Sequence, residues 1–145
     1  MPIVSRTAIV NYTADEMFRL VTDIEAYPEF LPWCAGAKSD RPGDETTIAT
    51  LKIAKGPLRK SFTTRNVSTP GASIRMELVE GPFEYLQGHW LFAPLGAKGS
   101  RVSLEVEFSF SHALIRGTFA KVFSHISGEL VDAFCRRATV IYGRR

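Results

Sequence analysis

The sequence has few cysteines and no long apolar run, and both absences limit what the chain can be. Cys34 and Cys135 are the only cysteines in 145 residues, too few for a disulfide framework and without the spacing of a metal site. We expect both to be reduced thiols at apolar positions. No apolar stretch is long enough to cross a bilayer, and the first residues lack the apolar segment of a signal peptide. These features predict a cytoplasmic protein and leave peripheral contact with the inner membrane open.

Sequence motifs for metal, nucleotide or covalent chemistry are also missing. The chain contains no HExxH, CxxC or P-loop sequence, and no GxGxxG follows a predicted strand. The histidines, His89, His112 and His125, fall in different predicted elements, and none has an evident carboxylate partner. We therefore predict no catalytic residue, no metal and no cofactor, and a protein that is not an enzyme.

Neither sign of charge dominates the chain. There are 18 Lys and Arg against 15 Asp and Glu, which gives a net charge of +3. The basic residues are scattered except at the C-terminal end, where Arg136, Arg137, Arg144 and Arg145 gather. Such a cluster suits an acidic partner, RNA or a lipid surface, but cations at a helix C-terminus also complement the helix dipole. The length and the 45% hydrophobic content predict one domain over residues 1–145.

A long amphipathic helix is predicted from about Ser111 to Tyr142. Its other side carries charged and polar residues, so the apolar face must be covered. Gly117 and Gly128 interrupt this helix where alanine would be more stabilising by about 1 kcal/mol each, which suggests a kink or a close approach. Apolar residues recur in this stretch at helical spacing: Ile115, Phe119, Val122, Phe123, Ile126, Leu130, Phe134, Ala138 and Ile141.

The rest of the chain alternates between strand patterns and turns. A first strand is predicted from Ile3 to Tyr12, and Thr13 to Glu16 then forms a capping box that begins a short helix. Turn sequences separate the later strands, and residues 102–110 alternate most regularly between apolar and polar. The order predicts an α+β fold. It has a curved antiparallel sheet of about seven strands, two short helices after strand 1, and the long C-terminal helix across the concave face.

Four segments carry a more specific resemblance. They are residues 27–34 (YPEFLPWC), 56–67 (GPLRKSFTTRNV), 81–83 (GPF) and 88–92 (GHWLF). Together they resemble the coenzyme Q-binding START-domain family, within the polyketide cyclase/dehydrase superfamily, which includes the bacterial ribosome-association toxins. The resemblance implies a helix-grip (START-like) fold. It also implies non-catalytic binding of ubiquinone, or a related polyprenyl lipid, in support of respiratory electron transport.

A quinone needs an apolar, elongated cavity with a few polar groups, and the predicted inward faces can supply one. We expect the lining to consist of Leu51, Ile53, Phe62, Met76, Trp90 and Phe92 from the sheet and Phe119, Val122, Phe123 and Ile126 from the helix, with Phe30 and Trp33 at the entrance. The polar residues expected to point inward are Thr47, Thr50, Thr64 and Asn66. The alternative for each apolar residue is ordinary core packing. The loop at 27–34 is accordingly either a rim at the entrance, where it could touch a membrane, or a plug at one end of the core.

Two other functions stay open at this point. The toxin name of some relatives suggests a ribosome-binding translation regulator, although no RNA-stacking surface of aromatic residues interleaved with arginines is evident. An enzyme of the aromatic cyclase type would need polar groups projecting into the pocket, and the predicted inward faces offer few.

Overall fold

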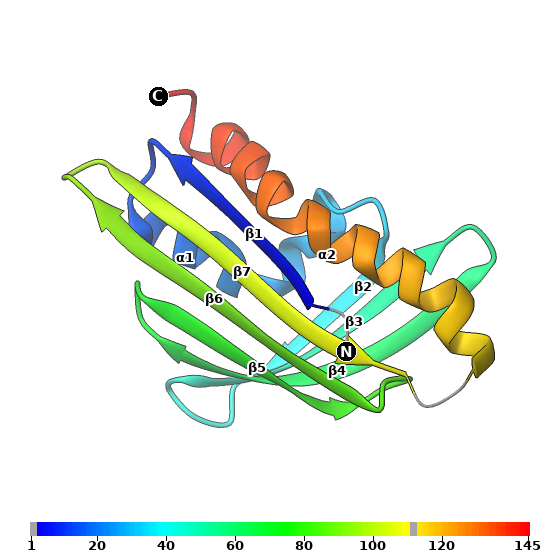
Figure 1. Ribbon diagram of the computed structural model, residues 1–145. Helices are drawn as coiled ribbons and strands as arrows, with labels where there is room; N and C mark the ends of the chain where they lie inside the picture. The colour runs from blue at the N-terminus through cyan, green and yellow to red at the C-terminus, as the bar shows by residue number, and fades with distance from the viewer. Residues whose placement is uncertain (1–2, 111–112) are drawn as a thin grey trace.

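The computed structural model describes the backbone of residues 3–110 and 113–145 and the side chains of residues 3–110 and 117–145. Its centre is a seven-stranded antiparallel sheet with the order β1-β7-β6-β5-β4-β3-β2. The elements in chain order are β1 (Ile3–Val10), α1 (Ala14–Thr22), the 3-10 helix η1 (Ile24–Glu29), β2 (Cys34–Asp40), β3 (Thr46–Lys55), β4 (Leu58–Thr69), β5 (Ser73–Glu80), β6 (Tyr85–Leu95), β7 (Gly99–Ser109) and α2 (Ala113–Tyr142). Figure 1 shows the sheet curving around α2. The predicted α+β architecture is confirmed.

The sheet is built mainly from hairpins. Strands β2 to β7 follow one another through turns, while β1 pairs with β7, so β1 and β2 form the two edges. The register shifts between Cys34 and Gly36 in β2 and between Thr63 and Thr64 in β4. Because a bulge bends its strand and increases the twist, these two irregularities help to curve the sheet around the helix.

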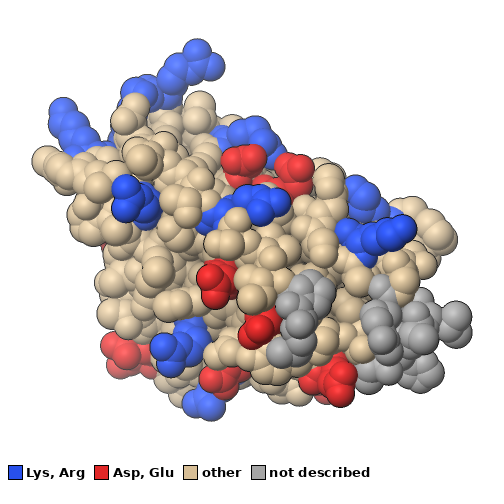
Figure 2. All heavy atoms as spheres, viewed as in Figure 1, with Lys and Arg blue, Asp and Glu red and all other residues tan. Residues whose placement is uncertain are grey.

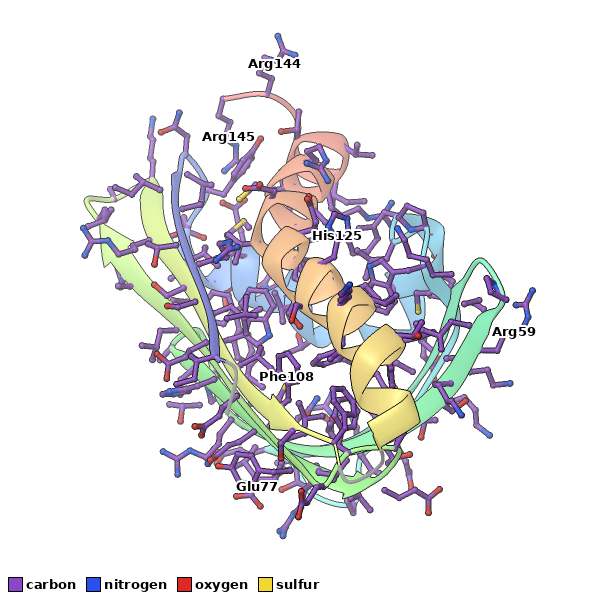
Figure 3. The ribbon with its side chains drawn as sticks, turned by 45° about the vertical axis from the view of Figure 1, so that its right-hand side comes forward. Arg59, Glu77, Phe108, His125, Arg144 and Arg145 are labelled. Carbon is purple, nitrogen blue, oxygen red and sulfur yellow. The ribbon has the colours of Figure 1, made fainter. Side chains whose placement is uncertain are left out.

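Alternation along the strands decides which side chains reach the concave face. In β7, Val102, Leu104, Val106 and Phe108 are buried, whereas the residues between them are exposed or half-buried. Figure 3 shows Phe108 pointing into the space between the sheet and α2, and Glu77 on the convex side. The convex face is open to water, so only the concave face needs an apolar cover.

Helix α1 begins as the capping box predicts. The backbone N–H of Glu16 donates a 3.1 Å hydrogen bond to the Thr13 hydroxyl, and the backbone N–H of Thr13 donates a 2.9 Å hydrogen bond to the Glu16 carboxylate. Met17, Leu20 and Val21 are buried on the inner side of this helix. The cap therefore fixes where the chain turns from β1 into the core.

The second short helix, η1, is a 3-10 helix of six residues with Pro28 inside it. Backbone bonds of 3.2 Å run from Ala26 N to Asp23 O and from Phe30 N to Tyr27 O, each spanning three residues. Proline has no N–H to donate to an α-helical ladder, which explains the short, tight helix at this position.

Helix α2 is continuous over 30 residues. Its buried face toward the sheet contains Phe119, Phe123, Ile126, Val131, Phe134 and Ala138. Ile141 was predicted on the same face but is 50% exposed. The reason is that the last turn packs on α1 through Tyr142, whose hydroxyl donates a 2.9 Å hydrogen bond to the carbonyl of Glu16. Ile115, also predicted on that face, lies outside the described side chains.

The two helix glycines differ in their surroundings. A Cβ built on Gly128 would lie 3.1 Å from Nη2 of Arg6 in β1, whereas a Cβ on Gly117 would meet nothing within 4 Å. The predicted close approach therefore holds for Gly128, whose neighbour is the end of the flexible Arg6 side chain, and not for Gly117.

Candidate functional site

A cavity of about 80 Å³ lies between the concave face of the sheet and α2. Most of its lining is apolar. Eight of the predicted site residues line it: Trp33, Leu51, Ile53, Phe62, Met76, Trp90, Phe123 and Ile126. The sequence reasoning missed a further group of apolar lining residues: Ile24, Tyr27, Ala49, Leu86, Val106, Leu130 and Phe134. The lining of the cavity is thus partly as predicted, and its role in binding stays a prediction.

Three residues predicted to line the cavity lie elsewhere. Phe92 stacks on Trp90 with ring centroids 6.0 Å apart and meets the edge of Phe18 in α1, so helix α1 covers it. Phe119 is fully buried among other rings and does not reach the cavity. Val122 is partly buried but is rotated about 100° around the helix axis from Phe123, which does line the cavity.

The end of the core near the start of α2 is filled by phenylalanines. Phe83 is central, because its ring lies 4.9 Å from Phe110, 4.8 Å from Phe123 and 5.6 Å from Phe119 and Phe62. Edge-to-face and stacked rings at these distances pack closely. This cluster explains why Phe119 is ordinary core and why the open space lies further along the helix.

An open groove of about 490 Å³ adjoins the cavity. It is lined by residues of the 27–34 loop, of the end of β3 and of α2: Phe30, Leu31, Pro32, Trp33, Ala54, Lys55, His125, Ile126, Glu129, Ala133 and Arg136. Trp33 and Ile126 line both the groove and the cavity, so they stand between the two spaces. The large apolar side chains of residues 27–34 divide into a buried part and a half-buried part. Tyr27 and Leu31 are buried as a plug, while Phe30 and Trp33 are half-buried along the groove.

Phe30 lines the groove on one side and, with Arg137, a second hollow between α1 and the end of α2 on the other. Its ring packs against the edge of Phe134 at 5.2 Å, and the guanidinium of Arg137 sits 4.8 Å above the ring. Arg137 also pairs with Glu29 at 3.1 Å. Phe30 therefore lies outside the cavity, and its place at a ligand entrance stays a prediction.

Three buried polar side chains line the cavity: Thr64, Asn66 and Ser127. Thr47 reaches only a small side chamber of about 20 Å³. The prediction that Thr50 points inward is wrong, because strand alternation places Ala49 and Leu51 inward. Thr50 instead shares a 2.8 Å hydrogen bond with Thr63. Ser127 was missed, although it lies four residues after Phe123 on the buried face of α2.

The ionisable groups near the cavity are neutral or turned away from it. Burial raises the pKa of the Tyr27 phenol, which donates a hydrogen bond to the carbonyl of Val21. Burial also raises the pKa of the Cys34 thiol and of the Cys135 thiol, and both cysteines are free. In the register of the sheet, His89 lies opposite Arg75 of β5 and Glu105 of β7, and its side chain points away from the cavity, as predicted.

The other two histidines are also accounted for. His125 is exposed on α2 beside the groove, as Figure 3 shows, and His112 lies outside the described residues. Within residues 3–110 and 117–145, no group of three or more His, Cys, Asp or Glu side chains could hold a metal ion. None of the helices in the described part of the chain is long and apolar enough to cross a membrane.

Charges on the face that carries α2 are mixed. Figure 2 shows Lys and Arg interspersed with Asp and Glu there, with several basic side chains toward the C-terminal end. Arg145, which belongs to that end, is paired with Glu16 at 2.7 Å and lies over the rings of Tyr12 and Tyr142. Arg145 of the predicted basic cluster therefore makes contacts within the fold.

Comparison with known proteins places this architecture in a family. The family model for polyketide cyclase/dehydrase and lipid transport proteins matches residues 10–135. The Ribosome association toxin RatA of Vibrio cholerae is 43% identical and aligns over 99% of both chains, and the protein of that name in Escherichia coli is 42% identical over all of this chain and 92% of its own. A more distant relative is the mitochondrial Coenzyme Q-binding protein COQ10 homolog B of Xenopus laevis. It is 26% identical over 97% of this chain and 59% of its own length.

Solved structures with a similar fold support the same family. An 18 kDa protein from Caulobacter crescentus superposes with a TM-score of 0.77 at 34% identity and covers 99% of this chain and all of its own. The Zhui aromatase/cyclase from a Streptomyces strain reaches a TM-score of 0.83 at 18% identity, over 96% of this chain and 95% of its own, which shows a shared fold alone. The chain belongs to the polyketide cyclase/dehydrase and lipid transport family, with the START-like fold that the sequence motifs predict.

Proposed function

We propose that this chain binds ubiquinone, or a related polyprenyl lipid, between the sheet and α2 without catalysing a reaction on it. The observation that carries the proposal is the cavity, whose lining is apolar except for a few uncharged polar side chains. Such a lining suits a lipid with a small oxygen-bearing head group. The name of the Xenopus relative, a coenzyme Q-binding protein, supports the same ligand.

The cavity must open to accept such a ligand. Its volume of about 80 Å³ is well below the roughly 300–1,000 Å³ of ordinary small-molecule pockets. The adjoining groove adds about 490 Å³ and is separated from the cavity by Trp33 and Ile126. Moving these two side chains would join the spaces. The head group would then occupy the cavity, and the isoprenoid tail would lie along the groove.

The same groove suits contact with a membrane surface. Phe30, Pro32 and Trp33 form an apolar rim, and Lys55 and Arg136 lie beside them in the groove. Apolar rings with basic neighbours favour the interface of a bilayer that contains anionic lipids. A lipid could therefore pass between the bilayer and the cavity through the groove. This arrangement implies peripheral, reversible contact with the membrane.

Titration with decylubiquinone tests the binding proposal. Quinones quench nearby indole fluorescence, and Trp33 and Trp90 both line the cavity. We expect saturable quenching at micromolar quinone or below. Free N-acetyltryptophanamide in the same detergent serves as the control for collisional quenching. Quenching that is no stronger than in this control, and does not saturate, would contradict the proposal.

Association with the ribosome is a second candidate, favoured by the relatives that are 42–43% identical and are named Ribosome association toxin RatA. Exposed Arg136 and Arg144 would provide basic contacts for RNA phosphates. Co-sedimentation with ribosomal subunits on sucrose gradients tests this candidate. Binding should weaken with added salt and with Arg136→Glu plus Arg144→Glu, whereas recovery only in the top fractions would exclude it.

A further inference from the structure

Asn66 and Thr64 form a polar pair on the cavity wall. They lie two residues apart on β4, so both side chains point to the concave face, and each is only 6% exposed. The Thr64 hydroxyl donates a 2.8 Å hydrogen bond to Oδ1 of Asn66. The amide of Asn66 is thereby oriented by its neighbour within the sheet.

Among the described side chains, the Asn66 amide nitrogen has no hydrogen-bond partner. Within residues 3–110 and 117–145, Nδ2 of Asn66 makes no hydrogen bond, and no fully enclosed side-chain nitrogen or oxygen lacks one. Because it is not fully enclosed, Nδ2 borders the space that Asn66 lines, which is the cavity together with the side chamber of about 20 Å³ that shares Asn66, Met76 and Trp90 with it. Ser100, another buried polar residue, differs, because its hydroxyl donates to the carbonyl of Tyr12. A buried amide donor that faces an apolar cavity is suited to a ligand oxygen.

Asn66 also lies far along the sheet from the groove. It pairs in register with Thr47 near the start of β3, whereas the carbonyl of Trp33 accepts a 2.8 Å hydrogen bond from Ala54 near the end of β3. Ala54 comes seven positions after Thr47, and seven rises of an extended strand span about 23 Å. Asn66 and the boundary with the groove thus lie at opposite ends of the ligand space.

We propose that Asn66, held in position by Thr64, determines specificity by donating its Nδ2–H to a carbonyl oxygen of the ligand. The ligand class is a lipid with a carbonyl-bearing ring and a long apolar tail. Its ring lies at the Asn66 end of the cavity, and its tail leaves between Trp33 and Ile126. This inference rests on the proposed lipid binding and adds the direction in which the lipid enters.

The test compares two probes that share a tail but differ in ring oxygens. Decylubiquinone has carbonyl and methoxy oxygens, and decylbenzene has none. Displacement of a fluorescent anilinonaphthalene probe from the folded protein measures the affinity for each. We expect Asn66→Leu to bind decylubiquinone about tenfold more weakly, which corresponds to about 1.4 kcal/mol, and to bind decylbenzene at least as well as the parent does.

Neighbouring residues on β4 supply the control variants. Thr64→Val should weaken decylubiquinone binding by a few-fold, because Asn66 loses its orienting partner. Thr63→Val, on the other face of the same strand, should leave both affinities unchanged. If Asn66→Leu fails to fold by circular dichroism, Asn66→Val replaces it, since valine also lacks the donor and suits a strand, and the same loss is expected.

The outcomes distinguish this inference from the proposed function. Equal decylubiquinone affinity in the parent and in the folded Asn66 variant would overturn the specificity role while leaving lipid binding intact. A parent protein that binds neither probe would overturn the proposed function itself. An equal loss of affinity for both probes in the Asn66 variant would also overturn the specificity role of Asn66, because the effect would then not depend on the ligand oxygens.

Discussion

Trp33 and Ile126 both stand at the boundary between the buried cavity and the open groove, because each lines both spaces. Trp33 is half-buried in a loop that is held to β3 through the carbonyl of Trp33 and the N–H of Ala54. Ile126 is 2% exposed on α2. Because one residue belongs to a loop and the other to a helix, we propose that a small shift of either element joins the two spaces while the sheet stays intact.

Trp33 should report contact with a membrane. In a Trp90→Phe background, the emission of Trp33 should shift to shorter wavelength when liposomes containing anionic lipid are added, because the ring leaves water for the interface. A Trp33→Phe protein that retains Trp90 is the matched control and should show no shift. An unchanged Trp33 spectrum over liposomes of varied charge would count against membrane docking.

Ala49 and Ala138 are buried alanines in different surroundings. Ala49 lines the cavity, whereas Ala138 is fully buried in α2 and does not line it. We expect Ala138→Leu to cost about 1–3 kcal/mol in the free energy of unfolding through overpacking, and Ala49→Leu to cost less because its methyl groups enter open space. Urea unfolding of both variants checks this difference. Equal, large losses would mean that the space beside Ala49 is effectively filled.

Thr13→Ala tests the start of α1. This substitution removes the hydroxyl that accepts from the backbone N–H of Glu16, and loss of such an N-cap costs about 1 kcal/mol, in the range 0.5–2. Thr13→Ser keeps the oxygen and should restore most of that stability. If Thr13→Ser and Thr13→Ala lower the urea unfolding midpoint equally, the methyl group of Thr13, and not its hydroxyl, provides the stabilisation.

The pair between Glu16 and Arg145 makes stability depend on pH. Hydrogen bonds from Arg145, and then from the Thr13 backbone, lower the pKa of the Glu16 carboxyl below its ordinary value of 4.5. The unfolded chain therefore binds this proton more readily than the folded chain does. The stabilisation is complete above about pH 5 and is lost as the pH falls below 4.5 through the folded pKa. Glu16→Gln should flatten this part of the urea-midpoint profile, and an unchanged acid slope would exclude the pair as its source.

The two thiols should react slowly in the folded protein. Burial raises the pKa of Cys34 and of Cys135, so less thiolate is present near neutral pH than in a free cysteine. Ellman's reagent should modify both only after urea is added. The Cys34→Ser, Cys135→Ser double variant should keep the fold and any bound quinone. Loss of the quinone with the fold intact would indicate thiol chemistry at the site.

Sequence reasoning was most accurate where local spacing alone determines the structure. The strict alternation in β7 and the reciprocal Thr13–Glu16 cap depend on local spacing, and both appear as expected. Local spacing also explains the error at Thr50, since an inward Ala49 requires the next side chain to point outward. Periodicity therefore determined the faces of β7 correctly, but on α2 it placed Val122 and Ile141 on the buried face, where Val122 is only partly buried and Ile141 is 50% exposed.

Periodicity does not determine what lies opposite a side chain. Phe92 and Phe119 are on inward faces, yet α1 covers the first and the cluster around Phe83 encloses the second. Ser127 was missed because a single serine does not disturb an apolar face, although its position four residues after Phe123 places it there. Which inward residues border open space depends on packing between distant segments, and this requires the structure.

Extraction of the purified protein with organic solvent, followed by mass spectrometry, tests the central claim most directly. Protein would be prepared from a ubiquinone-producing bacterium, with Ala49→Leu purified in parallel as the variant whose cavity is filled. The account predicts ubiquinone in the parent extract at a substantial molar fraction of protein, and much less in the extract of the equally folded variant. A parent extract without quinone, or equal amounts from both proteins, would contradict binding in this cavity.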